Sequence, residues 1–86
     1  MKIPEGFERI APENLEPNQT YLLDNAFGHG FVETLEQLPI TDKRGPGWLV
    51  EIKDGGFRPP LQKTLGKGQT FVVKDGSSAK WYEVKG

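Results

Sequence analysis

The 86-residue chain contains no cysteine and only one histidine. Without cysteine it can form neither a disulfide framework nor a thiolate-ligated zinc site. Small secreted domains often depend on such crosslinks, so we expect a protein of a reducing compartment, the cytoplasm. No stretch is apolar over enough residues to form a secretory signal or to span a bilayer, and we therefore expect no association with membranes.

Motifs for catalysis and for cofactor binding are also missing. His29 lies between two glycines, and nothing in the sequence brings a nucleophile near it. Glu33 and Glu36 would point to opposite faces of a strand, which does not suit a pair of catalytic carboxylates. The aspartates lack calcium-loop spacing, and residues 66–68 lack the phosphate-loop pattern. We expect no enzyme activity, no cofactor and no metal site.

Turn-forming residues are abundant. The chain has 11 glycines and 7 prolines, and they separate short apolar runs instead of forming one tract. This distribution is typical of an all-β protein. The apolar content of 35% is low, but the spread of aromatic residues along the chain favours a folded domain over a disordered one.

The net charge of −1 conceals an asymmetry. Residues 1–42 contain two basic and eight acidic side chains, a net charge of −6, whereas residues 43–86 contain nine basic and four acidic ones, a net charge of +5. We favour an arrangement in which the two halves interleave and their charges pair across strands. The alternatives are a basic partner-binding face and head-to-tail self-association.

Two segments fifty residues apart resemble each other. LEPNQTYLLD begins at residue 15 and LGKGQTFVVKD at residue 65, and they share a leucine and a Gln-Thr pair at matching positions. The same offset places residues 31–34 on residues 81–84. Asn18 and Gly68 precede the two Gln-Thr pairs, and both tolerate a positive φ. The similarity predicts two hairpins of like form, for which we favour shared hairpin chemistry over gene duplication.

Local patterns set the expected elements. Residues 1–14 are expected to be irregular apart from one 3₁₀ turn after Pro12, anchored by Leu15. Residues 31–38 fit either a helix or a strand, and the repeat favours a strand. The remaining predictions follow from composition and turn signals: strands at 20–24, 48–54 and 80–85, a loop at 25–30, a strand end at Asp54-Gly55-Gly56 and a hairpin turn at Asp75-Gly76.

These elements predict a single all-β domain over residues 1–86 with little or no helix. Five short strands separated by Gly/Pro turns imply a small barrel or a strongly bent antiparallel sheet. An SH3-like barrel is the preferred architecture and an OB-like barrel is the alternative. Neither architecture determines a function.

The leading functional hypothesis is a non-enzymatic protein-interaction module, such as a free-standing accessory, inhibitor or assembly protein of bacterial or viral origin. The alternative is a nucleic-acid-binding barrel that uses the basic loops of the C-terminal half, although a pI near 5.8 is low for that class. Trp81 is the candidate aromatic anchor, because Trp81 and Tyr82 must face opposite sides of a strand. The candidate binding residues are Lys43, Arg44, Phe57, Arg58, Lys63, Lys67 and Trp81.

Overall fold

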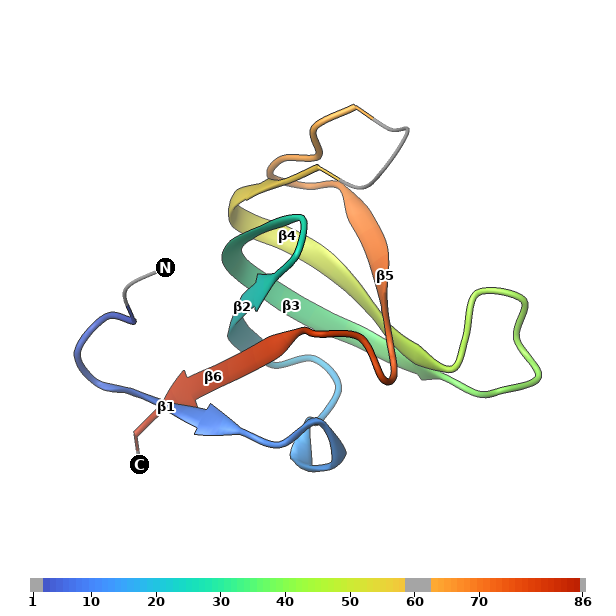
Figure 1. Cartoon of the computed structure of the whole chain (residues 1–86), viewed down its shortest axis with the longest axis horizontal. Helices are drawn as coiled ribbons and strands as arrows, with labels where there is room; N and C mark the ends of the chain where they lie inside the picture. The colour runs from blue at the N-terminus through green and yellow to red at the C-terminus, as the bar shows by residue number, and fades with distance from the viewer. Residues whose placement is uncertain (1–2, 59–62, 86) are drawn as a thin grey trace.

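The computed structural model describes residues 3–58 and 63–85 (Figure 1). In chain order the elements are β1 (Phe7–Ile10), the 3₁₀ turn η1 (Pro12–Asn14), β2 (Thr20–Asn25), β3 (Gly28–Leu38), β4 (Gly47–Phe57), β5 (Thr70–Lys74) and β6 (Lys80–Val84). The predicted all-β class is confirmed. Within these residues, no helix has the length and apolar character that crossing a membrane requires.

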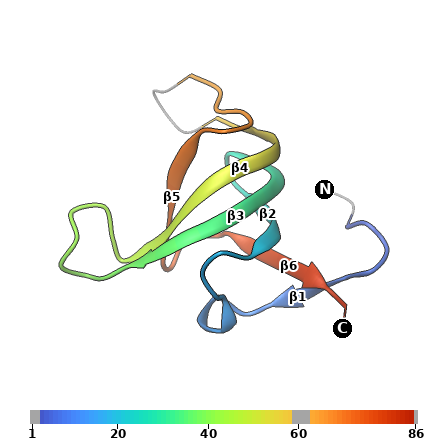
Figure 2. The ribbon, with the colours of Figure 1, turned by 180° about the vertical axis from the view of Figure 1, so that it is seen from behind.

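The six strands form one antiparallel sheet in the order β1-β6-β2-β3-β4-β5. Figures 1 and 2 show β3 and β4 curving strongly, with the paired strands β1 and β6 at one end of the molecule. The strongly bent antiparallel sheet that the sequence predicts is therefore present. The sheet does not close into a barrel, because β1 and β5 are its two end strands.

The N-terminal segment differs from the irregular conformation expected for residues 1–14. Residues 7–10 form β1, which pairs with β6 from Phe7 opposite Val84 to Ile10 opposite Trp81. Four residues are too few to give a strand pattern in the sequence, and β1 exists because β6 offers it an edge. The 3₁₀ turn is confirmed at Pro12–Asn14, and Leu15 after it is buried in the core.

The ambiguous segment 31–38 is a strand, as the repeat indicated. It belongs to β3, which begins at Gly28 and is 11 residues long. The predicted loop 25–30 is therefore only a two-residue turn, Ala26-Phe27, within which the Phe27 N–H donates to the Asn25 side chain at 2.9 Å.

The predicted end of the strand at Asp54-Gly55-Gly56 is wrong. β4 continues to Phe57, and its residues Gly55 and Gly56 lie opposite Gly30 and His29 of β3. The two backbones approach so closely that a Cβ atom on Gly30 would lie 2.2 Å from the Asp54 carbonyl oxygen. Asp-Gly is a strong hairpin signal in isolation, but here the glycines permit a close approach of two paired strands.

The fifty-residue similarity is visible in the backbone. Asn18 and Gly68 both have positive φ, at 61° and 89°, as predicted. The Asn18 N–H donates to the Thr34 carbonyl at 2.6 Å, and the Gly68 N–H donates to the Ile52 carbonyl at 2.8 Å. In return, the Thr34 N–H donates to the carbonyl of residue 19 and the Ile52 N–H donates to the carbonyl of residue 69. An approximate two-fold axis between β3 and β4 therefore relates the β2–β3 pair to the β5–β4 pair.

The predicted second hairpin does not form. A turn is present after β5, where Gly76 has a φ of 78°, but β6 leaves β5 and pairs with β2 and β1. This crossover places the Trp81 ring edge-on to Tyr21 of β2, with ring centroids 6.2 Å apart. Burial of an indole against an aromatic ring favours this pairing over continuation of the hairpin. The similarity of residues 31–34 to 81–84 therefore has no structural counterpart.

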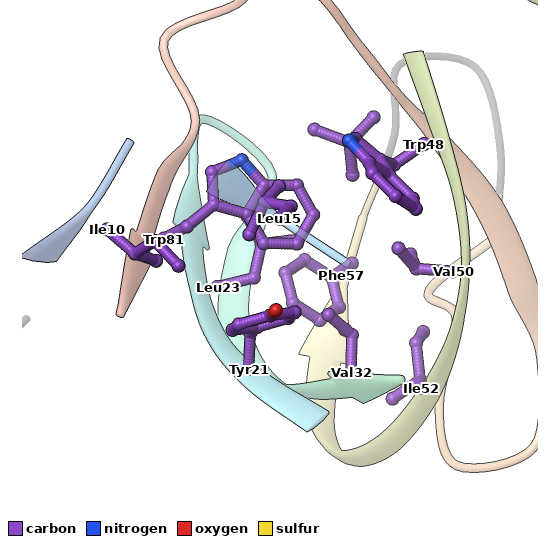
Figure 3. Close-up of a cluster of buried hydrophobic side chains, with 11 residues drawn as sticks. Ile10, Leu15, Tyr21, Leu23, Val32, Trp48, Val50, Ile52, Phe57 and Trp81 are labelled. Atoms are coloured by element: carbon purple, nitrogen blue, oxygen red, sulfur yellow. The ribbon is translucent and has the colours of Figure 1, made fainter. Parts of the chain in front are cut away.

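The main core lies inside the bend of the sheet. It draws on β1, β2, β3, β4, β5 and β6, and on Leu15 after η1. Figure 3 shows the two indoles, Trp48 from β4 and Trp81 from β6, at one end of this cluster. Trp48, Val50 and Ile52 alternate along the strand predicted at 48–54, and the burial of all three shows that they share its inward face.

Candidate interaction surface

The five basic candidate residues do not share one face. Lys43 and Arg44 lie in the β3–β4 connection, whereas Arg58, Lys63 and Lys67 lie in the β4–β5 connection, beyond the other end of β4. Figure 1 shows these two connections in different parts of the molecule. A nucleic-acid surface built from all five residues requires them to converge, and they do not.

Arg44 is engaged by neighbouring carboxylates. Its Nε lies 3.2 Å from Asp42 Oδ1 and its Nη2 lies 3.9 Å from Glu36 Oε1. The hydrogen bonds from the Arg44 side chain and backbone hold the pKa of Asp42 below its usual value, and the Asp42 hydrogen bond raises the pKa of Arg44. Much of the Arg44 charge is therefore balanced by these carboxylates, whereas Lys43 forms no ion pair with residues 3–58 or 63–85.

Both aromatic candidates lie in the core. Phe57 is fully buried and packs against Phe71 with ring centroids 5.0 Å apart, and Trp81 is 2% exposed. The expectation of an exposed aromatic anchor at Trp81 is corrected by this burial, and Phe57 is likewise closed to a partner. The opposite side of β6 carries Tyr82, so the aromatic outside the main core is Tyr82 and not Trp81.

The acidic and basic halves interleave at the centre of the sheet. Glu33 of β3 lies opposite Glu51 of β4, and Lys53 Nζ lies 3.1 Å from Glu33 Oε1 and 2.9 Å from Glu51 Oε2. Hydrogen bonds to Glu51 and then Glu33 raise the pKa of Lys53. Here a basic side chain from the second half bridges a carboxylate from each half, as the favoured interpretation of the charge split predicted.

A second apolar cluster lies on the face of the sheet opposite the core. Leu22 pairs with both Tyr82 and Phe31 in the strand register, and residues that lie opposite each other point to the same face. Phe7 joins them, with its ring centroid 5.7 Å from that of Phe31. The Arg9 guanidinium lies 5.8 Å from the centre of the Tyr82 ring. Beside this cluster Val84 is 67% exposed.

A shallow groove of about 540 Å³ adjoins this second cluster. Leu22 and Phe31 form its apolar wall. The glycines of the paired segments of β3 and β4 form its floor. We call it the glycine groove, and it is lined by Pro4, Leu22, Gly28, His29, Gly30, Phe31, Asp54, Gly55 and Gly56. Four glycines contribute no side chain to this floor, and of these Gly55 and Gly56 of β4 are exposed, whereas Gly30 of β3 is buried.

Sequence reasoning missed this surface, although a signal for it exists. Tyr21, Leu22 and Leu23 are consecutive apolar residues in one strand, so one of them must point away from the other two. In the structure Tyr21 and Leu23 belong to the core, and Leu22 takes the opposite face. A run of apolar residues in a strand therefore indicates two covered faces.

No group of three or more potential metal ligands comes together within residues 3–58 and 63–85. His29 is exposed on the groove wall. Comparisons of the chain with protein-family models, with curated proteins and with solved structures find no match.

Proposed function

We propose that this protein is a non-enzymatic interaction module and that it binds a segment of another protein in the glycine groove. The observation that carries the proposal is the groove itself, an apolar wall beside an open backbone floor on the face away from the core. A floor of glycines has no side chains to obstruct the flat backbone of an extended peptide, so such a segment could lie along it. Apolar side chains of the peptide would cover Phe31 and the second cluster.

The basic β4–β5 connection suggests the charge of the partner segment. Arg58 is exposed and follows the groove residue Gly56 by two positions, and its N–H donates to the Phe27 carbonyl at 2.8 Å. Lys63 and Lys67 belong to the same connection and are exposed. The single acidic lining residue, Asp54, already accepts a hydrogen bond from the Gly55 N–H. We infer a partner segment with apolar residues and at least one flanking carboxylate.

The architecture we propose for this module is a variant of the small SH3-like barrel that stays open between β1 and β5. We propose a cytoplasmic accessory or assembly role, in which the module recognises its partner and leaves chemistry to other proteins. Lys43 and Arg44 do not belong to the proposed contact surface, because they lie beyond the far end of β4.

The test is a bulk-adding substitution on the groove floor. Gly56 has no positive φ, and a Cβ atom there would meet nothing closer than 3.7 Å, so Gly56→Gln places its Cβ atom without strain at the backbone. Gly66 is the matched control, because a Cβ atom there meets nothing within 4 Å and Gly66 does not line the groove. Peptides selected on the immobilised wild-type protein from a random 12-residue library serve as the probe.

We expect the selected peptides to share apolar residues next to Asp or Glu. Their affinity, measured by fluorescence anisotropy, should fall at least about tenfold for Gly56→Gln, because a large side chain displaces the bound backbone. Gly66→Gln should bind like the wild type. Equal binding by the Gly56→Gln protein, with its fold verified by circular dichroism, or selected peptides without an apolar and acidic pattern, would overturn the proposal.

A further inference from the structure

A separate cavity lies at the end of the main core where β3 ends and β4 begins. Its volume is about 280 Å³, and it shares no lining residue with the glycine groove. Trp48, Trp81 and Val73 contribute buried side chains to its base. Its polar side chains come from η1, β3, and β5 with the turn after it, and they include Glu13, Gln37, Lys74, Asp75 and Ser77.

Both tryptophans line this cavity, and neither indole N–H is used elsewhere in the described part of the chain. Trp48 and Trp81 are 4% and 2% exposed, and within the described ranges no hydrogen bond joins either indole nitrogen to another residue. Every fully buried side-chain nitrogen in that part of the chain has a hydrogen-bond partner. The two indole nitrogens have none, so neither is fully buried and each remains partly accessible. Figure 3 shows the two nitrogens on the side of the cluster away from Tyr21 and Ile52.

The exposed part of each tryptophan determines which ligand atom fits. An indole edge with its N–H group is a hydrogen-bond donor only, and the edge of an aromatic ring is electropositive. The rings themselves are packed into the core, so their electronegative faces cannot hold a cation. The base of the cavity therefore selects for a hydrogen-bond acceptor.

The rim adds a second requirement. Glu13 and Asp75 are acidic and Lys74 is basic, so the lining carries a formal charge of −1. A carboxylate would meet the two indole donors but would be repelled by this rim. A carboxamide meets both conditions, because its oxygen accepts from the indoles while its NH₂ group donates to a rim carboxylate. The cavity is smaller than most drug-sized sites and suits one side chain.

We propose that this cavity binds a primary carboxamide, the side chain of a glutamine or asparagine presented by a partner polypeptide. The site is independent of the glycine groove, so either can fail its test without affecting the other. Specificity arises from the paired indole donors and the acidic rim, which together distinguish Gln from Glu although the two side chains have nearly the same shape.

The test uses the indole signals of the intact protein. The chain has two tryptophans, so an ¹H–¹⁵N spectrum contains two indole signals, which Trp48→Phe and Trp81→Phe assign. N-acetyl-glutamine amide and N-acetyl-glutamate amide are titrated at pH 7 to about 50 mM, since small ligands bind weakly. Saturable movement of both indole signals is expected with the glutamine compound, and about two- to fivefold weaker binding with the glutamate compound.

A rim variant makes the test specific. Glu13 is exposed, and Glu13→Gln should bring the affinities of the two compounds closer together, whereas Glu5→Gln, an exposed change elsewhere, should leave their ratio unchanged. The proposal is overturned if neither compound moves the indole signals, if the glutamate compound binds as well as the glutamine compound, or if Glu13→Gln leaves their ratio unchanged.

Discussion

Thr34→Val should destabilise the protein more than any other isosteric change that we consider. Thr34 is the one residue among the described ranges that is both polar and buried in the core face. Its hydroxyl donates to the Glu16 carbonyl and accepts from the Gln19 N–H at 3.2 Å. Valine keeps the shape of threonine but leaves this carbonyl and this N–H without the hydroxyl that joins the β2 turn to β3.

The size of the effect follows from these two bonds. A net intramolecular hydrogen bond contributes about 1 kcal/mol, and a polar group left partly buried without a partner costs about 1–3 kcal/mol. Glu16 and Gln19 are exposed residues, so water restores part of the loss. We therefore expect a decrease of about 2 kcal/mol in the free energy of unfolding. For a domain of this size that decrease lowers Tm by roughly 8–16 °C.

Urea denaturation followed by tryptophan fluorescence measures this change, because unfolding exposes two buried indoles. Thr20→Val is the matched control, since Thr20 lies in the same turn region but is exposed. We expect the control to stay within about 0.5 kcal/mol of the wild type. A Thr34→Val protein that also unfolds within about 0.5 kcal/mol of the wild type would refute the reasoning, because the hydroxyl would then contribute nothing net.

Three further predictions follow from the packing and the charges. Gly30→Ala should cost at least about 2 kcal/mol in denaturant titrations, because its Cβ meets strand backbone, whereas Gly66→Ala should be neutral or stabilise by up to about 1 kcal/mol. Trp81→Ala should lower stability by about 3–5 kcal/mol, and Tyr82→Ala, outside the main core, should cost clearly less in the same assay. The pKa of Lys53 is raised, so its ion pairs contribute fully to folding stability below about pH 10.5. That contribution is lost as the pH rises through the folded-state pKa of Lys53. Lys53→Met should therefore flatten the alkaline fall in Tm, and an unchanged alkaline profile would contradict this.

Much of the local structure could be predicted from the sequence. Asn18 and Gly68 are residue types that favour a positive φ, and both have one. The alternation of apolar residues from Trp48 to Ile52 predicts which face of that strand is buried. These features depend on neighbours in the chain, so their signals are local. The strand pattern of β2 is also a local signal, because it depends only on residues that are adjacent in the chain.

The errors concern interactions between distant segments. Asp75-Gly76 does form a turn, but the strand after it does not return to β5. β6 pairs with β2 instead, where Trp81 packs against Tyr21. Likewise, Gly55 and Gly56 predict a turn by composition, but in the fold they continue β4, paired with Gly30 and His29 of β3. The burial of Trp81 follows from that same pairing, and no local pattern specifies it.

The approximate two-fold axis between β3 and β4 has a consequence for solubility. β5 has the same relation to β4 as β2 has to β3, yet β2 has a further neighbour in β6 while the outer edge of β5 has none in the sheet. An open edge of this kind is a template for aggregation. Here the turn at residues 25–27 faces Val72 and Lys74 across a cavity of about 280 Å³, with Phe27 40% exposed above it. The turn of one hairpin therefore lies beside the edge of the other, and it narrows the space in which a strand of a second molecule could pair with that edge.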